Sequence, residues 1–179
     1  MEDTMRLLDP RTFRDACGVF ATGVNVITTH SDGHDHGMTA NAFMSISLDP
    51  PLIAISIAEK ARMLEKIQKS GRFAVSVLAC GMDSVAWHFA GKPNADLHDL
   101  FDTLDGLPVI RGALVTFSAI VHDEILAGDH TIFVGRVQSL ARSDGDEPLL
   151  FFKGKFGAVE NTRKAASVYR LEVETEFMW

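Results

Sequence analysis

The segment from Gly37 to Pro51 (GMTANAFMSISLDPP) is unusually rich in small and polar residues for a stretch that is otherwise strand-forming. Its hydroxyl and amide groups come from Thr39, Asn41, Ser45 and Ser47. Small side chains also leave the backbone N–H groups open to close approach by a ligand. A flat ligand with polar edges needs this combination of donors, so the segment is the first candidate for a binding site.

A second candidate is the segment around Lys60 and Arg62, at the start of a predicted helix. Unpaired backbone N–H groups and the positive end of the helix dipole add there to two cationic side chains, which suits a phosphate or pyrophosphate. The simpler interpretation, that both side chains are solvated surface charges, is favoured by this segment alone. Because the chain contains neither G-x-G-x-x-G nor G-x-x-x-x-G-K-[ST], a nucleotide would not be held by those motifs.

Histidines mark two further candidates. Gly128-Asp129-His130 indicates a tight turn followed by an apolar strand, where an imidazole can bind a carboxamide or a phosphate. A hydrogen-bonded structural histidine is an equally good interpretation. His34 and His36 form an H-x-H pattern that could bind zinc in a strand. They fall in a predicted polar turn over residues 30–37, without an obvious third ligand, so we expect no metal site.

Composition and missing motifs exclude several function classes. The net charge of −7 argues against nucleic-acid binding, and no apolar run is long enough to cross a membrane. A Ser-His-Asp hydrolase is disfavoured because no G-x-S-x-G elbow occurs. Residues 1–10 do not resemble a secretory signal, and Cys17 and Cys80 lack C-x-x-C spacing. We therefore expect a cytoplasmic protein with free, buried thiols.

The elements that must position these residues are short. A length of 179 residues predicts one domain. Apolar periodicity predicts helices over 12–20, 61–70 and 82–90, the second with Met63, Leu64 and Ile67 on one face and a Glu65–Lys69 pair on the other. Strands are predicted over 24–29, 38–46, 52–57, 73–79, 113–126, 130–140, 149–152 and 168–173, with a loop over 91–105. Hairpin turns between the strands predict a mainly antiparallel barrel decorated by helices.

Seven segments together resemble one known family, in order and at its spacing. They are ATGVNVITT (21–29), HGMTANAFMSISLDPP (36–51), FAVSVL (73–78), FAGK (89–92), LPVI (107–110), AGDHTIFVGRV (127–137) and PLLFFKGKF (148–156). Over residues 12–158 the chain resembles the short-chain flavin reductases, the reductase components of two-component flavin-dependent monooxygenases. The segment EKARMLEKI (59–67) resembles in particular the phenol 2-hydroxylase reductase component, which has bound FAD.

The resemblance implies an FMN-binding split β-barrel, antiparallel and of Greek-key type, with short flanking helices and a homodimeric assembly that helps to build the site. It implies that the isoalloxazine is held by Thr39, Ala40, Asn41, Ala42 and Phe43, with Ser45 and Ile46 nearer the nicotinamide. It implies that the flavin phosphates and ribityl chain are bound by Lys60, Ala61, Arg62, Met63, Leu64, Glu65 and Lys66. His130 would contact and orient NADH, under a loop formed by Lys153, Gly154, Lys155 and Phe156. Residues 159–179 form a C-terminal extension outside the match.

The function implied is hydride transfer from NADH to FAD or FMN, with reduced flavin passed to a separate aromatic-compound monooxygenase. No catalytic side chain is expected, because the hydride moves between two cofactors that the protein only positions. The alternative is a flavin carrier or sensor on the same barrel that does not turn over, since a fold does not decide a function. A haem- or pyridoxal-phosphate-binding relative is a third hypothesis, which the Gly-Asp-His turn does not support.

Overall fold

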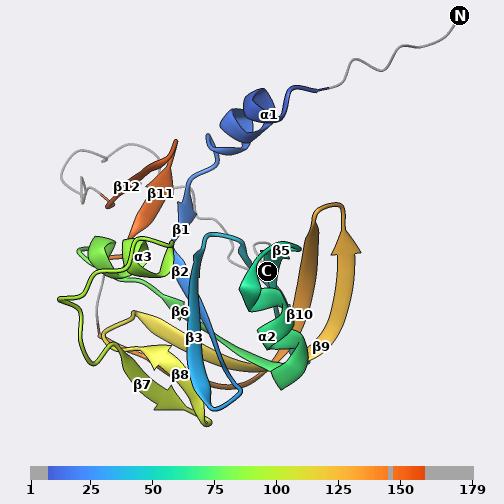
Figure 1. The fold of residues 1–179 in the computed structure, drawn as a ribbon, viewed down its shortest axis with the longest axis vertical. Coiled ribbons are helices and arrows are strands. Elements are labelled where there is room, and N and C mark those ends of the chain that lie inside the picture. Colours follow the sequence, from blue (N-terminus) through green and yellow to red (C-terminus); the bar gives the residue numbers. More distant parts are fainter. Residues whose placement is uncertain (1–7, 145–146, 160–179) are drawn as a thin grey trace, which may run out of the picture.

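The computed structural model describes residues 8–144 and 147–159, which form a mainly β, antiparallel structure with few helices (Figure 1). The helices are α1 (Pro10–Cys17), α2 (Arg62–Ser70) and α3 (Asp83–Phe89). The strands are β1 (Thr22–Gly23), β2 (Asn25–Ser31), β3 (His34–Ala40), β4 (Phe43–Leu48), β5 (Pro51–Ala58), β6 (Arg72–Val77), β7 (Phe101–Leu104), β8 (Leu107–Ile110), β9 (Val115–Ala127), β10 (His130–Arg142), β11 (Leu150–Phe152) and β12 (Lys155–Gly157). Within the described ranges, no helix is long and apolar enough to cross a membrane.

One large sheet organises the molecule. Its seven strands run in the order β3-β2-β6-β9-β10-β5-β4, and each neighbouring pair is antiparallel. The two edge strands, β3 and β4, follow each other in the chain with only Asn41 and Ala42 between them. Because the chain passes from one edge to the other in two residues, the sheet has to curve until the ends of its edge strands meet.

Helix α2 packs on the concave side of this sheet and closes the main core. Its buried residues, Met63, Leu64 and Ile67, join a cluster that includes Phe73 from β6 and Phe133 from β10. The helix ends at Gly71, whose left-handed φ of 66° suits a residue without a Cβ. This apolar face, predicted from the sequence, fixes which side chains at the start of α2 remain outside the core.

Smaller elements surround the large sheet. Strands β1, β11 and β12 form a second sheet, and β7 pairs with β8. Helix α1 stands apart from the rest of the molecule with no buried residue, and it is followed by Gly18, whose carbonyl accepts a bond of 2.9 Å from the Lys153 backbone N–H (Figure 1). Helix α3 lies beside the end of β3, which brings the central part of the chain next to the first candidate segment.

The structure corrects several expectations. The single strand predicted over residues 38–46 is two strands on opposite sheet edges, because strand propensity does not report the pairing partner. His34 and His36 lie in β3 and not in a turn, since the turn is only Asp32 and Gly33, both with positive φ. The sequence predicts no metal site at these two histidines. Among the described residues, no group of three or more His, Cys, Asp or Glu side chains could hold a metal ion.

Other local predictions also differ. Residues 91–105 contain strand β7, because pairing with β8 organises a sequence that looks like a loop. Lys69 pairs with Asp32 and not with Glu65. Cys17 and Cys80 are both exposed, so the expectation of buried thiols was wrong. The strand predicted over residues 168–173 lies outside the described residues.

Candidate functional site

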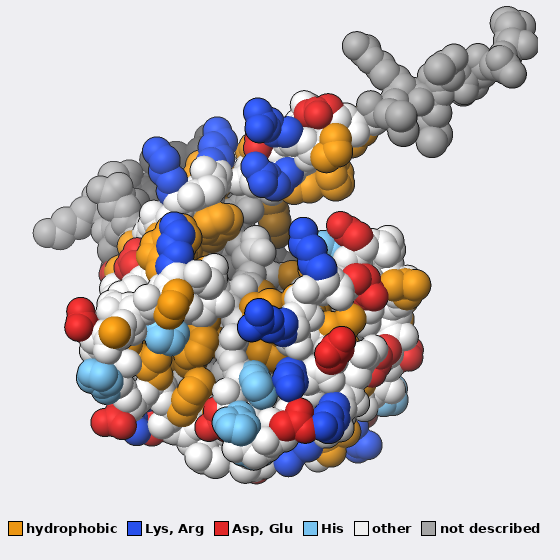
Figure 2. All heavy atoms as spheres, viewed as in Figure 1, with side chains coloured by type: hydrophobic (Ala, Val, Ile, Leu, Met, Phe, Trp, Pro, Cys, Tyr) orange, Lys and Arg blue, Asp and Glu red, His pale blue; other side chains and the backbone are white. Residues whose placement is uncertain are grey.

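A cleft of about 620 Å³ opens between β3, the start of α2 and the end of α3. Its lining includes Asp35, His36, Gly37, Met38, Thr39, Ala61, Arg62, Met63, Lys66, Phe89, Ala90 and Gly91. Basic and histidine side chains gather over the middle of this face, where β3 and α2 lie (Figure 2). We call the part of the cleft formed by Arg62 and Lys66 the charged end.

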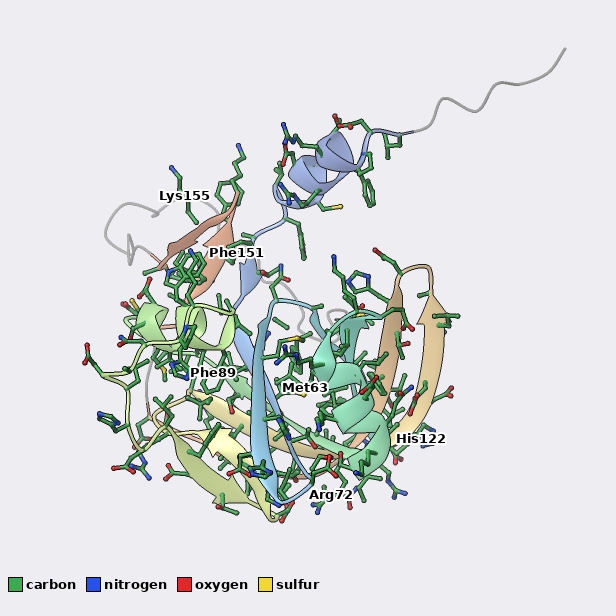
Figure 3. The ribbon with its side chains drawn as sticks, in the orientation of Figure 1. Met63, Arg72, Phe89, His122, Phe151 and Lys155 are labelled. Atoms are coloured by element: carbon green, nitrogen blue, oxygen red, sulfur yellow. The ribbon has the colours of Figure 1, made fainter. Side chains whose placement is uncertain are left out.

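The charged end follows from the local sequence of α2. Its N-cap is Ala61, whose methyl side chain makes no capping hydrogen bond, so N–H groups of the first turn remain available to a ligand. Arg62 and Lys66 are four residues apart and therefore lie on one side of the helix, next to the buried Met63 (Figure 3). Open N–H groups and two cations at a helix start suit a phosphate-bearing ligand.

Acidic groups also reach this end. Asp32, in the β2–β3 turn, places Oδ2 3.1 Å from Lys66 Nζ and also pairs with Lys69. Hydrogen bonds from Lys69 and Lys66 hold the pKa of the Asp32 carboxyl well below its usual range. Asp35 lines the cleft and lies 2.6 Å from the His30 ring nitrogen Nδ1.

A second, smaller cavity of about 240 Å³ adjoins the cleft, and the two share Thr39 and Ala90 as lining residues. Its lining also includes Val24, Ala40, Asn41, Trp87, Phe151, Gly154 and Phe156. We call it the aromatic end. The ring centroids of Trp87 and Phe156 are 5.0 Å apart, and Lys92 Nζ lies 3.9 Å from the centroid of the Trp87 ring. These contacts hold the Trp87 ring in place although the residue is 40% exposed.

Two close contacts join β3 to α3 where the ends meet. The Thr39 hydroxyl donates to the Ala86 carbonyl across 2.6 Å, so this hydroxyl is occupied and the cavity receives mainly backbone and small side chains from β3. A Cβ added to Gly37 would lie 2.6 Å from the Phe89 ring. The glycine that opens the polar segment is therefore needed for helix packing, which brings Trp87 to the cavity.

His130 begins β10, opposite Ala58 on β5. Its Nδ1 lies 2.7 Å from the Asp129 carboxylate, and this hydrogen bond is the main cause of a lowered Asp129 pKa. Since an ionised carboxylate can only accept, Nδ1 carries the proton and Nε2 is left for another partner. The Asp129 carbonyl accepts from the Glu59 backbone N–H at 2.9 Å, which places this turn beside Lys60.

The structure brings about half of the predicted site residues together. The predicted residues that line the two adjoining cavities are Thr39, Ala40, Asn41, Ala61, Arg62, Met63, Lys66, Gly154 and Phe156. Those that do not are Ala42, Phe43, Ser45, Ile46, Lys60, Leu64, Glu65, His130, Lys153 and Lys155. Leu64 lies in the core, Phe43 stacks on Phe117, and Lys155 points away from the sheet (Figure 3).

Trp87 and Phe151 are two of the lining residues that sequence reasoning missed. Trp87 occupies a short helix in which apolar and polar residues alternate without a clear face, so its type alone does not mark it. Their positions could have indicated them, because Trp87 lies two residues before FAGK (89–92) and Phe151 lies within PLLFFKGKF (148–156). Only the fold shows that the two segments meet.

The residues present fit a flavin nucleotide. The aromatic end offers ring faces and open backbone to a flat heterocycle, and the charged end offers cations and helix N–H groups to phosphate. No residue that lines the aromatic end is titratable, so an uncharged ring is not penalised by a buried charge there. The two ends adjoin, as one elongated ligand with a ring and phosphates requires.

Comparison with known proteins identifies the family. Residues 17–160 match the family described as "Flavin reductase like domain". An NADH-dependent flavin reductase from Rhodococcus sp is 42% identical over 167 residues, which span 89% of this chain and 94% of that protein. The reductase component of 4-hydroxyphenylacetate 3-monooxygenase from Thermus thermophilus is 35% identical over 145 residues, 79% of this chain and 91% of that protein.

A solved structure agrees with these matches. Flavin reductase PheA2 in its native state superposes with a TM-score of 0.82 at 49% identity, and the match covers 86% of this chain and 99% of that one. The fold, the cleft and the matched sequence thus lead to the same conclusion. The chain belongs to the flavin reductase-like family.

Proposed function

We propose that this protein is an NADH-dependent flavin reductase, which transfers a hydride from NADH to FAD or FMN and supplies reduced flavin to a separate monooxygenase. The observation that carries the proposal is the junction of an aromatic cavity with a cationic cleft at Thr39 and Ala90. Relatives that match most of the chain are named as NADH-dependent flavin reductases or as monooxygenase reductase components.

The residues of the cleft divide the work of binding. Arg62, Lys66 and the N–H groups at the start of α2 bind the phosphates. Backbone groups of Thr39, Ala40 and Asn41, with the Asn41 side chain, hold the ring, and Trp87 and Phe156 pack over it and exclude water. A bound flavin supplies the hydride acceptor, which no amino-acid side chain can provide.

The protein needs no acid or base for this chemistry. The aromatic end is lined by aromatic, aliphatic, hydroxyl and amide side chains, none of which titrates. The aromatic end would hold the flavin and nicotinamide rings in contact and exclude water from them. We assign His130 to orienting NADH through Nε2, while Asp129 holds Nδ1.

A homodimer and a split barrel complete the proposal. Met44, Ile46 and Leu48 project from edge strand β4 with exposures of 59%, 45% and 75%. A second copy seated on β4 would cover these side chains and bring Ser45 and Ile46 into the ligand-binding wall. The two-residue link between edge strands β3 and β4 supports a barrel that remains open between them. In this arrangement Ser45 and Ile46, which lie outside the cavities of a single chain, would act in the assembled dimer.

The test uses the purified full chain. NADH absorbance is followed with riboflavin, FMN or FAD added, and with NADPH in place of NADH, while bound flavin is identified by chromatography. We expect NADH to be consumed only when a flavin is present. A yellow protein that oxidises neither nicotinamide with any flavin would contradict the proposal and support the carrier alternative, which no present observation favours.

A further inference from the structure

The β2–β3 turn places an acid against the charged end of the cleft. Asp32 has a φ of 57° and, with Gly33, makes the turn that brings its carboxylate to α2. Asp32 Oδ2 lies 3.1 Å from Lys66 Nζ, and the other carboxylate oxygen pairs with Lys69. Lys66 lines the cleft, and its side chain is only 30% exposed. One of the two cations at the charged end is therefore already paired.

This pairing changes what Lys66 can offer a ligand. A carboxylate in contact with an ammonium group cancels most of its field at a distance and uses one of its three N–H donors. A phosphate that approaches Lys66 must share the ammonium with Asp32 or displace it. Arg62, in contrast, forms no ion pair within the described part of the chain, so it meets the same phosphate at full charge.

We propose that Asp32 sets the affinity of the charged end: it weakens binding of the ligand's phosphates by Lys66 and so keeps the flavin exchangeable. The inference rests on the proposed function, because it takes the phosphates of a flavin nucleotide as the ligand of this end. An enzyme that delivers reduced flavin to a separate partner has to release its product. A carboxylate that competes with phosphate for Lys66 favours release without altering the ring-binding end.

Comparison of riboflavin with FMN isolates the effect, because the two ligands differ only in the phosphate. Dissociation constants for both are measured from flavin fluorescence at low ionic strength, using wild type and Asp32→Asn. Asn also tolerates a positive φ, so the turn is preserved. We expect Asp32→Asn to lower the Kd for FMN by about 2- to 5-fold, the size of a partly exposed ion pair, and to leave riboflavin unchanged. Raising the salt to about 1 M should remove the difference.

Two further variants control for charge and for mechanism. Asp102→Asn removes the same charge from an exposed pair with Arg111, 2.9 Å apart on the β7–β8 hairpin, and should change neither Kd. Lys66→Met should remove most of the gain from Asp32→Asn in the double variant, because the two effects share one ammonium group.

Three outcomes overturn the inference. Weaker FMN binding in Asp32→Asn would mean that the carboxylate positions Lys66 for the phosphate. Equal changes for riboflavin and FMN would mean that the turn acts on the whole cleft, and an unchanged FMN Kd would mean that Asp32 has no influence. A wild-type protein that binds neither flavin would instead overturn the proposed function itself.

Discussion

The charged end and the aromatic end of the cleft are built in different ways. The charged end comes from one helix start and one hairpin turn, and of its two cations Lys66 is ion-paired with Asp32 and partly exposed. The aromatic end is assembled from β3, α3 and the β11–β12 hairpin, which are far apart in the sequence. Charges at a surface give salt-dependent, modest affinity, whereas packed rings give affinity through buried area. The ligand's ring and its phosphates should therefore respond to different substitutions.

The largest effect is expected at the aromatic end. Trp87→Ala removes a ring that lines the cavity, and base–aromatic stacking is worth about 1–3 kcal/mol, so the Kd for riboflavin and for FMN should both rise by roughly tenfold or more. The factor should be the same for both ligands, because the phosphate is bound elsewhere. Titration of flavin fluorescence measures both, with Trp87→Phe as the control that keeps a ring. If the Kd values for riboflavin and FMN changed by different factors, the ring and the phosphate would not be bound by separate ends.

Measurements of thermal stability test the packing of β3 against α3, where the two ends meet. In Gly37→Ala the added Cβ would meet the Phe89 ring at 2.6 Å, and overpacking of this kind costs about 1–3 kcal/mol of unfolding free energy. Thermal unfolding should show a lowered Tm, which Phe89→Leu should partly restore. Gly23→Ala is the matched control, since a Cβ there meets nothing within 4 Å. If Gly37→Ala were as stable as Gly23→Ala, the packing of α3 against β3 would not depend on this glycine.

Helix α2 shows where prediction from sequence succeeds, and the wall of the cleft shows where it fails. The spacing of Met63, Leu64 and Ile67, followed by Gly71, is a local pattern, and the helix has the predicted buried face and end. Because that face is buried, Arg62 and Lys66 at the start of the helix remain outside the core. The break at Asn41 and Ala42 could not be predicted, because propensity along a chain says nothing about which strand pairs with which. Trp87 was missed because the contact that brings its helix to β3, between Thr39 and Ala86, spans 47 residues.

At the charged end we expect a smaller effect that depends on the ligand. Arg62→Ala removes a cation that lines the cleft, and it should raise the Kd for FMN by about fivefold, as loss of a partly exposed charge-assisted contact would. Riboflavin binding should not change. Arg136→Ala, an exposed arginine outside both cavities, removes the same charge and should leave both constants unaltered. Loss of riboflavin affinity in Arg62→Ala would show that the ring extends into the charged end.

The smallest expected difference is in response to acid. The pKa of Asp32 is lowered by Lys69 and Lys66, so its pairing stabilises the fold above the unfolded carboxyl pKa of about 4 and is lost as the pH falls below that value. The Tm difference between wild type and Asp32→Asn should be present at pH 7 and shrink toward pH 3. The difference between wild type and Trp87→Phe should not follow this pattern, because no residue lining the aromatic end titrates. If the Tm difference between wild type and Asp32→Asn stayed constant from pH 7 to pH 3, the ion pairing of Asp32 would be contradicted.

The most direct test is the crystal structure of the protein with FAD. We predict the isoalloxazine beside Thr39, Ala40 and Asn41 under Trp87, with phosphate oxygens within hydrogen-bonding distance of Arg62 or Lys66. The alternative is a cavity of about 680 Å³ between α1 and the β11–β12 hairpin, where Arg14 and Lys153 also offer cations. Phosphates bound by that pair, with the cleft at α2 empty, would contradict the proposed division of the site.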